Sequence, residues 1–334
     1  MIVKYGKKMD FRDLGRDAEF IEKAGLQNAD ISQRTYKNGT ANIDCCPICK
    51  SGSMQSLKEI NCFQWKKCEM CGHFFVVNVP IEVSGIYEAG NEAQTEAYIS
   101  DELFKKRRLL ISKPKAEFID SIIPPKKTKG LWVDIGCGVG ELLSEAALLG
   151  WETVGFEADP NEVEFARSHG IEVRQTYISG NFDTEISENL SNAKVVSIIN
   201  VLEHISSPLD WLNNVVAHMS KGAYLAIEVP REPSLTALCN LLGLPYKHMM
   251  TAGHYHIFTE KSMEVIQTHC SLEIMAKWCF GNGFVDLINT ALLLSGHDVN
   301  SAVIDTILEK TPDVQSAVDE AGLSEAMIVV FRVV

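Results

Sequence analysis

The chain has 334 residues, of which 46% are hydrophobic and 22% charged, and its formal net charge is −13. This composition is typical of a folded globular protein, and the length allows one large domain with a smaller one. The negative charge argues against a protein that binds nucleic acid through overall basicity. No apolar stretch is long enough to span a bilayer, and the N-terminal segment becomes charged before an apolar core develops. We therefore expect no membrane association and a cytoplasmic location.

Cysteines gather in the N-terminal part of the chain, where six of the ten lie between Cys45 and Cys71. A disulfide framework is unusual in a large cytosolic protein, so the cluster indicates a metal site. Two C-x-x-C pairs separated by eighteen residues provide four thiolates: Cys46, Cys49, Cys68 and Cys71. Four thiolates complete the tetrahedral coordination of Zn²⁺ and leave no open position. The spacing thus predicts a structural zinc in a small ribbon-like module.

Shifts in composition divide the chain into four expected parts. A short charged stretch at 11–26, before the cysteines, favours a helix. The expected parts are an N-terminal arm (1–43), a zinc-binding module (44–80), a helical segment or lid (81–128) and a core (129–334) with a helical insertion at about 284–322.

From residue 131 onward, apolar runs with strand character alternate with amphipathic helical segments. Strands are expected at 131–136, 152–159, 171–176, 193–201, 222–230, 271–280 and 325–334. Helices are expected at 140–150, 160–170, 209–220, 259–270, 284–296 and 301–322. Strands separated by helices predict a doubly wound, mostly parallel sheet of seven strands, in the α/β class.

The segment "VDIGCGVGE" (133–141) predicts a sharp turn from the first of these strands into a helix beside a ligand. Glu141 follows the last glycine, where a nucleoside-triphosphate loop requires lysine, so that class of site is excluded. The next strand ends in Glu157, where a carboxylate accepts hydrogen bonds from ribose hydroxyls. With Asp134 at the end of the first strand, the site is acidic, which favours a positively charged nucleoside over a pyrophosphate.

Four segments in this order, "VDIGCGVGELL", "GFEADP", "NVLEHISSPLDWL" and "AIEVPRE", resemble the class I S-adenosylmethionine-dependent methyltransferases over about residues 80–334. The resemblance implies a Rossmann-like fold and S-adenosylmethionine as cofactor. It implies that Glu157 binds the ribose, that Asn200 lies near the methionine moiety and that Tyr177 flanks the adenine. The residues implied around the cofactor are Asp134, Gly136, Cys137, Gly138, Glu157 and Asn200.

The combination of this core with an N-terminal four-cysteine module resembles the sugar methyltransferases of natural-product and surface-polysaccharide pathways. The resemblance implies a small-molecule acceptor, a sugar or nucleotide-linked sugar, methylated on oxygen or carbon. The helical region 95–123 and the loop 231–258 would then build the acceptor pocket. The basic run 105–108 would contact a phosphate of that acceptor, or form a solvated helix face.

Methyl transfer to a hydroxyl or carbon acid needs a base, and histidine suits that task near neutral pH. His204 follows the fourth strand of the core, at the edge where acceptor and cofactor meet. The alternative is a structural histidine at the start of a helix, hydrogen-bonded to the backbone. His254 and His256 flank Tyr255 in a later loop, and their alternate spacing predicts that both lie on one side of an extended segment. We expect the base among these three histidines, with Glu203 orienting the loop and Glu228 contacting acceptor hydroxyls.

Two alternatives remain at this stage. An RNA methyltransferase would use the zinc module to hold nucleic acid, and Trp65, Lys66 and Lys67 offer contacts for it, but the net charge argues against nucleic acid as a partner. A non-catalytic interaction protein would keep only the zinc-stapled fold. The intact set of Asp134, the glycines and Glu157 favours an enzyme.

Overall fold

The structure is a computed structural model that describes residues 1–6, 33, 36–37, 39–60, 62–81, 99–125, 127–178, 182–236, 253–294 and 301–334. The helix expected at 11–26 lies outside these residues, as do parts of the expected lid and of the loop 231–258.

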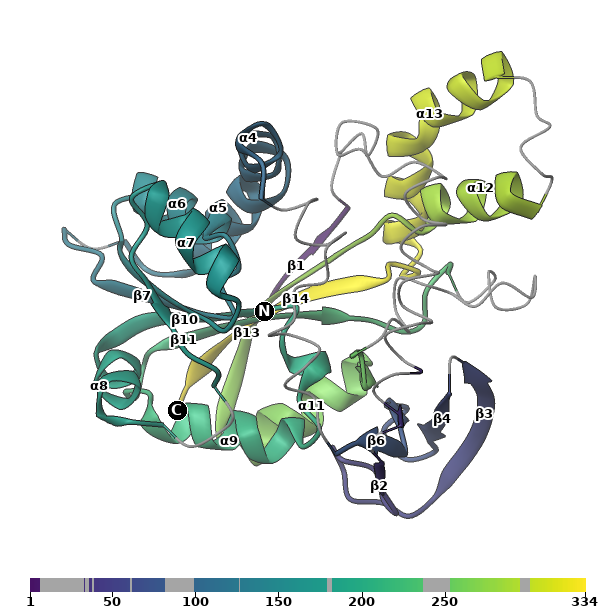
Figure 1. Ribbon diagram of the computed structural model, residues 1–334, viewed down its shortest axis with the longest axis horizontal. Coiled ribbons are helices and arrows are strands. Elements are labelled where there is room, and N and C mark those ends of the chain that lie inside the picture. The colour runs from purple at the N-terminus through teal and green to yellow at the C-terminus, as the bar shows by residue number, and fades with distance from the viewer. Residues whose placement is uncertain are drawn as a thin grey trace.

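An eight-stranded sheet forms the centre of the described molecule (Figure 1), in the order β1-β13-β14-β11-β10-β7-β8-β9. Its strands are β1 (Ile2–Tyr5), β7 (Leu131–Ile135), β8 (Glu152–Glu157), β9 (Val173–Gln175), β10 (Ala193–Ile199), β11 (Tyr224–Pro230), β13 (Leu272–Phe280) and β14 (Ala326–Val333). Strand β14 runs antiparallel to both neighbours, and the other pairs are parallel. The seven predicted strands and the mostly parallel sheet are confirmed. The eighth strand, β1, comes from the N-terminal arm and pairs with β13.

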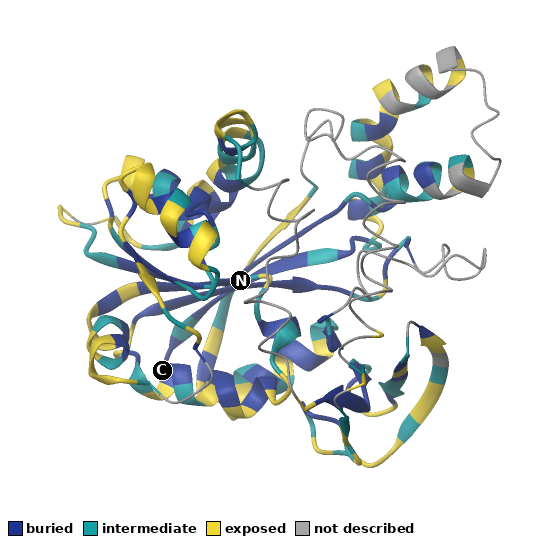
Figure 2. Ribbon diagram, viewed as in Figure 1, coloured by how far each residue is buried: buried dark blue, intermediate teal, exposed yellow. Residues whose placement is uncertain are grey.

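The central strands are buried on both faces, as Figure 2 shows by their dark blue colour. Every residue of β11 is buried, and β10 is buried at five of its seven positions. Strands covered by helices on both faces are typically continuous apolar runs, which explains segments such as "YLAIEVP". At the edge of the sheet all four residues of β1 are exposed.

Two groups of helices cover the two faces of the sheet (Figure 1). One face carries α4 (Asp101–Arg107), a π-helical turn (Arg108–Ser112), α5 (Lys113–Ile122), α6 (Glu141–Leu148) and α7 (Pro160–Ser168). The other carries α8 (Thr184–Asn192), α9 (Pro208–His218) and α11 (Glu260–His269). The helices α12 (Gly283–Leu294) and α13 (Ser301–Glu320) follow β13 and precede β14 in the sequence, and they pack against each other. This is the doubly wound α/β architecture predicted from the sequence.

The cysteine-rich segment forms a second, four-stranded sheet in the order β12-β5-β4-β3. Its strands are β3 (Met54–Ile60), β4 (Phe63–Cys68), β5 (Phe74–Val76) and β12 (His256–Ile257), and a separate pair joins β2 (Thr40–Asn42) to β6 (Asn78–Pro80). Strand β12 comes from the core, so this sheet joins the expected module 44–80 to the loop that carries the later histidines. Trp65 of β4 is only 1% exposed, which removes it as a stacking surface for RNA bases.

Candidate functional site

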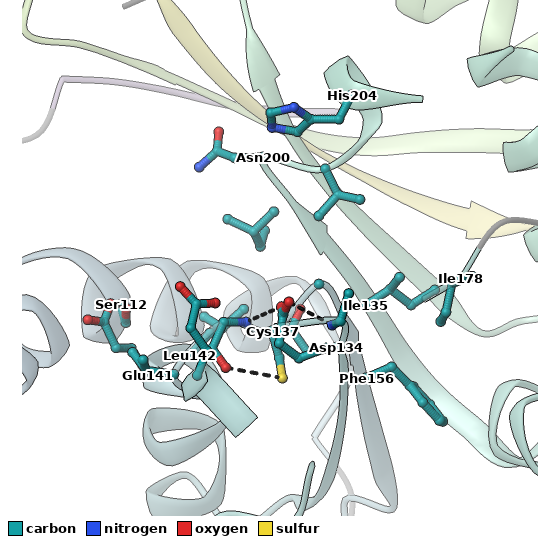
Figure 3. A pocket seen from close by; sticks show the side chains of 18 of the residues that line it. Ser112, Asp134, Ile135, Cys137, Glu141, Leu142, Phe156, Ile178, Asn200 and His204 are labelled. Atoms are coloured by element: carbon teal, nitrogen blue, oxygen red, sulfur yellow. Dashed lines mark hydrogen bonds between the residues drawn. The ribbon is translucent and has the colours of Figure 1, made fainter. Parts of the chain in front are cut away.

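A cavity of about 340 Å³ lies at the carboxyl ends of β7, β8 and β10 (Figure 3). In an open α/β sheet this edge is where ligands bind. Figure 3 shows Asn200 and His204 on one side of the cavity, opposite Asp134, Cys137 and Glu141. All six residues predicted around the cofactor line it: Asp134, Gly136, Cys137, Gly138, Glu157 and Asn200. Tyr177, expected beside an adenine, lines it too.

The turn between β7 and α6 requires its glycines. Gly136, Gly138 and Gly140 have φ of +69°, +55° and +79°, in the left-handed region that favours glycine. A β carbon on Gly136 would also lie 2.4 Å from Cγ2 of Val201, in the segment after β10. The backbone of the turn therefore lies close to Val201 at the end of β10, and both Gly136 and Val201 line the cavity.

Glu157 joins the end of β8 to this turn. Its Oε2 accepts a hydrogen bond from the backbone N–H of Gly138 at 2.9 Å. Its Oε1 accepts from the N–H groups of Ala158 and Asp159 at 2.7 and 3.0 Å. A carboxylate has roughly four lone-pair positions, so one remains for a ligand hydroxyl. The carboxylate is thus fixed in place and still able to accept a ribose hydroxyl.

Two further carboxyl groups make the cavity acidic. Asp134 is buried, and burial raises its pKa to about 7, with a contribution from the negative charge of Glu157 and an opposing hydrogen bond from Ser197. Burial also raises the pKa of Glu162, on α7, to about 8, again with the charge of Glu157 adding to the effect. A bound cation would favour the ionised form of both groups. Glu162 was not predicted, because an acid in the first turn of a helix is ordinary capping chemistry.

The basic run at 105–108 holds α4 and the π-helical turn against α6. Nε of Arg107 donates to Oε1 of Glu141 at 2.6 Å, and Arg108 donates to Glu145 at 2.8 Å. Lys106 pairs with Glu102 within α4. Three of the four cations thus have carboxylate partners, and Arg107 also lines the cavity.

A buried ion pair lies at the wall of the cavity, where Lys115 is a lining residue. Nζ of Lys115, on α5, lies 2.8 Å from Oε1 and 2.6 Å from Oε2 of Glu228 on β11. Their side chains are only 8% and 5% exposed, and Nδ2 of Asn200 lies 3.4 Å from the same Oε1. Lys115 was missed because a lysine in an amphipathic helix normally faces solvent. Glu228 was expected to contact acceptor hydroxyls, but it is not among the residues that line the cavity, whereas its counterion Lys115 is.

His204 lines the cavity as predicted. Its Nδ1 lies 2.9 Å from the carbonyl oxygen of Gly253, to which a neutral ring protonated on Nδ1 donates. Burial lowers the pKa of His204 to about 4, so the ring is neutral near pH 7. His254 packs edge-on against it, with ring centroids 4.6 Å apart. Nε2 of His254 lies 4.0 Å from Oε1 of the fully buried Glu203, whose pKa burial raises to about 8.

Neither His254 nor His256 is among the residues that line the cavity, and only His254 contacts His204, which corrects the expectation that the two later histidines share one side. His256 is fully buried, and its Nε2 donates to the carbonyl oxygen of Ile205 at 2.9 Å. Its Nδ1 therefore accepts from Nε2 of His73, at 3.1 Å, in the cysteine module. Alternate residues lie on one side only in an extended segment, and this segment is not extended throughout. Strand β12 begins only at His256, and the left-handed Gly253 (φ +89°) bends the chain before it. His256 thus links the module to the core.

The four predicted cysteines converge, with their sulfur atoms all within 4.8 Å of one another. The Sγ atoms of Cys46 and Cys71 are 3.6 Å apart, and those of Cys49 and Cys68 are 3.4 Å apart. A tetrahedral zinc with Zn–S bonds of about 2.3 Å places its sulfurs about 3.8 Å apart. The donor set and its spacing therefore fit Zn²⁺.

The two C-x-x-C turns have the same backbone geometry. In each, the residue after the second cysteine has positive φ, Lys50 at 59° and Gly72 at 71°. In each, that residue's N–H donates to the carbonyl oxygen of the first cysteine of the pair, at 2.9 and 3.0 Å. Two matching turns that present four thiolates to one point indicate a pair of metal-binding knuckles.

Comparison with known proteins places this cavity in context. A family model described as "Methyltransferase domain" matches residues 104–275, just over half of the chain. The Ubiquinone biosynthesis O-methyltransferase of Vibrio vulnificus (strain YJ016) is 30% identical over 175 residues, which cover 51% of this chain and 74% of that protein. The protein of the same name from Vibrio parahaemolyticus is 29% identical over 106 residues, and there the chain spans only 45% of the relative.

Solved structures also match this chain. Magnesium protoporphyrin IX methyltransferase from Synechocystis PCC 6803, with bound SAH, is 12% identical and has a TM-score of 0.44, over 69% of this chain and 88% of that one. A SAM-dependent methyltransferase from Archaeoglobus fulgidus is 18% identical, with a TM-score of 0.42 over 69% and 98% of the two chains. Within the described residues, no helix is both long and apolar enough to cross a membrane.

Proposed function

Because the chain belongs to the family of S-adenosylmethionine-dependent methyltransferases, we propose that it methylates a hydroxyl group of a sugar or nucleotide-linked sugar. The observation that carries this proposal is the division of the cavity. One end presents Glu157, the glycine turn and the buried acids, and the other presents His204 and Lys115, which is paired with Glu228.

The acidic end fits the cofactor. Glu157 keeps one acceptor position for a ribose hydroxyl, and Asp134 and Glu162 favour a positively charged ligand. S-adenosylmethionine carries a sulfonium, and its electrophilic methyl group is the one transferred. The protein aligns this methyl with the acceptor, which is the main requirement of an in-line displacement.

The affinity for S-adenosylmethionine should rise with pH. If Asp134, with a pKa of about 7, ionises in the complex, affinity increases about tenfold from pH 6 to pH 8.5, and ionisation of Glu162, with a pKa of about 8, adds to the rise. Calorimetric titration at the two pH values measures this change. The demethylated product, S-adenosylhomocysteine, has a neutral sulfur and serves as the matched ligand, with a smaller pH dependence. Equal pH dependence for both ligands would contradict the role given to the buried acids.

The other end of the cavity suits a polar acceptor. Lys115 and His204 line this end and offer a donor and an acceptor to a molecule with several hydroxyl groups. Oxygen as the acceptor atom is supported by the relatives, which are named O-methyltransferases. A sugar is supported by the joint resemblance of module and core. His204 and His254 are the groups at this end that we assign to act on the acceptor's hydroxyl.

A screen with tritium-labelled methyl groups tests the acceptor. The protein is incubated with labelled S-adenosylmethionine and, separately, with a panel of nucleotide sugars, with phenolic quinone precursors and with total RNA. We expect label in the nucleotide-sugar fraction. Label only in the phenols or only in RNA would refute the sugar assignment.

The four cysteines hold a structural Zn²⁺ in this proposal. The zinc module in turn positions the segment that carries His254 and His256. The hydroxyl of Thr259 donates to the carbonyl oxygen of Cys71 at 2.8 Å, beside the contact between His73 and His256. Together with the pairing of β5 and β12, these bonds attach the knuckle to the segment that carries His254. The module therefore supports one side of the acceptor end.

A further inference from the structure

We propose that Glu203, His204 and His254 bind a divalent transition-metal ion at the acceptor end of the cavity, separate from the four-cysteine site. Each offers one ligand atom, and the three atoms lie within 4.8 Å of one another. The inference rests on the proposed function and specifies how this end acts on the acceptor's hydroxyl.

Glu203 provides the strongest argument, because its carboxylate is buried without a hydrogen-bonding partner. The residue is 1% exposed, and neither Oε1 nor Oε2 accepts a hydrogen bond from any other residue in the described part of the chain. Buried carboxylates are normally hydrogen-bonded or paired with a cation. Nε2 of His254 is 4.0 Å from Oε1, too far for a hydrogen bond. A metal ion between the carboxylate and the imidazoles supplies the missing partner.

The histidines are oriented as metal-bound histidines usually are. In the tautomer in which Nδ1 of His204 donates to the carbonyl oxygen of Gly253, Nε2 is the ligand atom. Such a bond to a carbonyl fixes the tautomer and the ring plane of a metal-bound histidine. Gly253 directly precedes His254, and the N–H of Tyr255 donates to the carbonyl oxygen of Glu203 at 2.8 Å. These two contacts therefore fix the segment that carries Glu203 and His204 relative to the segment that carries His254.

The ligand types restrict the metal. Two imidazoles and one carboxylate suit Zn²⁺, Fe²⁺, Co²⁺ or Mn²⁺ better than Ca²⁺ or Mg²⁺, which prefer oxygen ligands. Metal–ligand bonds of about 2.1 Å bring neighbouring ligand atoms to about 3.0–3.4 Å, so the three side chains close in when the ion binds.

Three protein ligands leave coordination positions open, and His204 lines the cavity. Oxygen atoms on adjacent carbons of a sugar would fill those positions, and the metal would lower the pKa of the bound hydroxyl.

Cobalt titration of the zinc-loaded, full-length protein tests this site. Co²⁺ bound by nitrogen and oxygen gives visible d–d absorption without the near-ultraviolet charge-transfer band of a cysteine site. We expect one such Co²⁺ per chain. In Glu203→Gln and in His254→Ala the affinity for Co²⁺ should fall at least about tenfold. His169→Gln is the matched control, because His169 lies at the end of α7 beside Asp101, and its cobalt binding should equal that of the wild type.

A calorimetric titration with S-adenosylmethionine shows that each variant remains folded. Absence of the nitrogen–oxygen cobalt spectrum, or an unchanged cobalt affinity in Glu203→Gln, would overturn the metal site. Full methylation of a nucleotide sugar by chelator-treated enzyme that binds no cobalt in this way would overturn the site and leave the proposed function intact. Cobalt binding as expected, without methylation of any sugar, supports the site and contradicts the acceptor assignment.

Discussion

Replacing Cys46 by serine should reduce the zinc content from about one ion per chain to nearly none and unfold the cysteine module. Structural zinc in small domains contributes apparent binding free energies of about 10–16 kcal/mol, more than the small core of the module provides. That core joins β12 to β3, β4 and β5, so methyl transfer should fall as well, because His254 loses its support. Metal analysis, limited proteolysis and an activity assay measure the three effects.

Two neighbouring cysteines provide matched controls. Cys45 and Cys62 lie in the same segment and are outside the four-sulfur cluster. Cys45→Ser and Cys62→Ser should keep their zinc and their resistance to protease. If Cys46→Ser retained its zinc, or Cys45→Ser lost as much, the assignment of the four ligands would be wrong.

Replacing Lys115 by methionine should destabilise the protein by about 3–5 kcal/mol, because it leaves the buried Glu228 without its counterion. The double variant Lys115→Met, Glu228→Leu removes both charges and should recover most of that loss, since an apolar pair of similar volume often replaces a buried ion pair without cost. Urea unfolding of the two variants measures the difference.

An exposed ion pair serves as the control for this experiment. Lys50 and Asp210 lie 3.4 Å apart, and their side chains are 51% and 65% exposed. Lys50→Met should change the free energy of unfolding by no more than about 1 kcal/mol. If Lys115→Met were as mild as Lys50→Met, the pair beside the cavity would have no special role in stability.

Local sequence signals predicted most of the fold. The parallel strands are continuous apolar runs, and Asp159 followed by Pro160 marks the start of α7, where the Asp159 side chain accepts from the N–H of Asn161. Strand β1 was missed because its four residues are all exposed and carry no alternating pattern. Its place is set by pairing with β13, more than 270 positions away in the chain, a contact that no local pattern encodes.

Residues of the site were predictable where spacing alone determines their role. Glu157 and the glycines follow from the turn between strand and helix, and the cysteines follow from C-x-x-C geometry. Lys115 and Glu162 were missed because their roles depend on which strand end each helix approaches. For Glu203 a role in orienting the loop was expected, but its burial without a partner is visible only in three dimensions.

The division of the cavity into a cofactor end and an acceptor end is tested most directly by titrating S-adenosylmethionine into the wild type, Glu157→Ala and His204→Ala, with turnover measured on the same samples. We predict that Glu157→Ala weakens binding about 10- to 100-fold, because hydrogen bonds to a charged group are lost. His204→Ala should bind within about twofold of the wild type while its turnover falls about 10²- to 10⁴-fold. Unchanged binding in Glu157→Ala, or loss of binding in His204→Ala, would contradict the division.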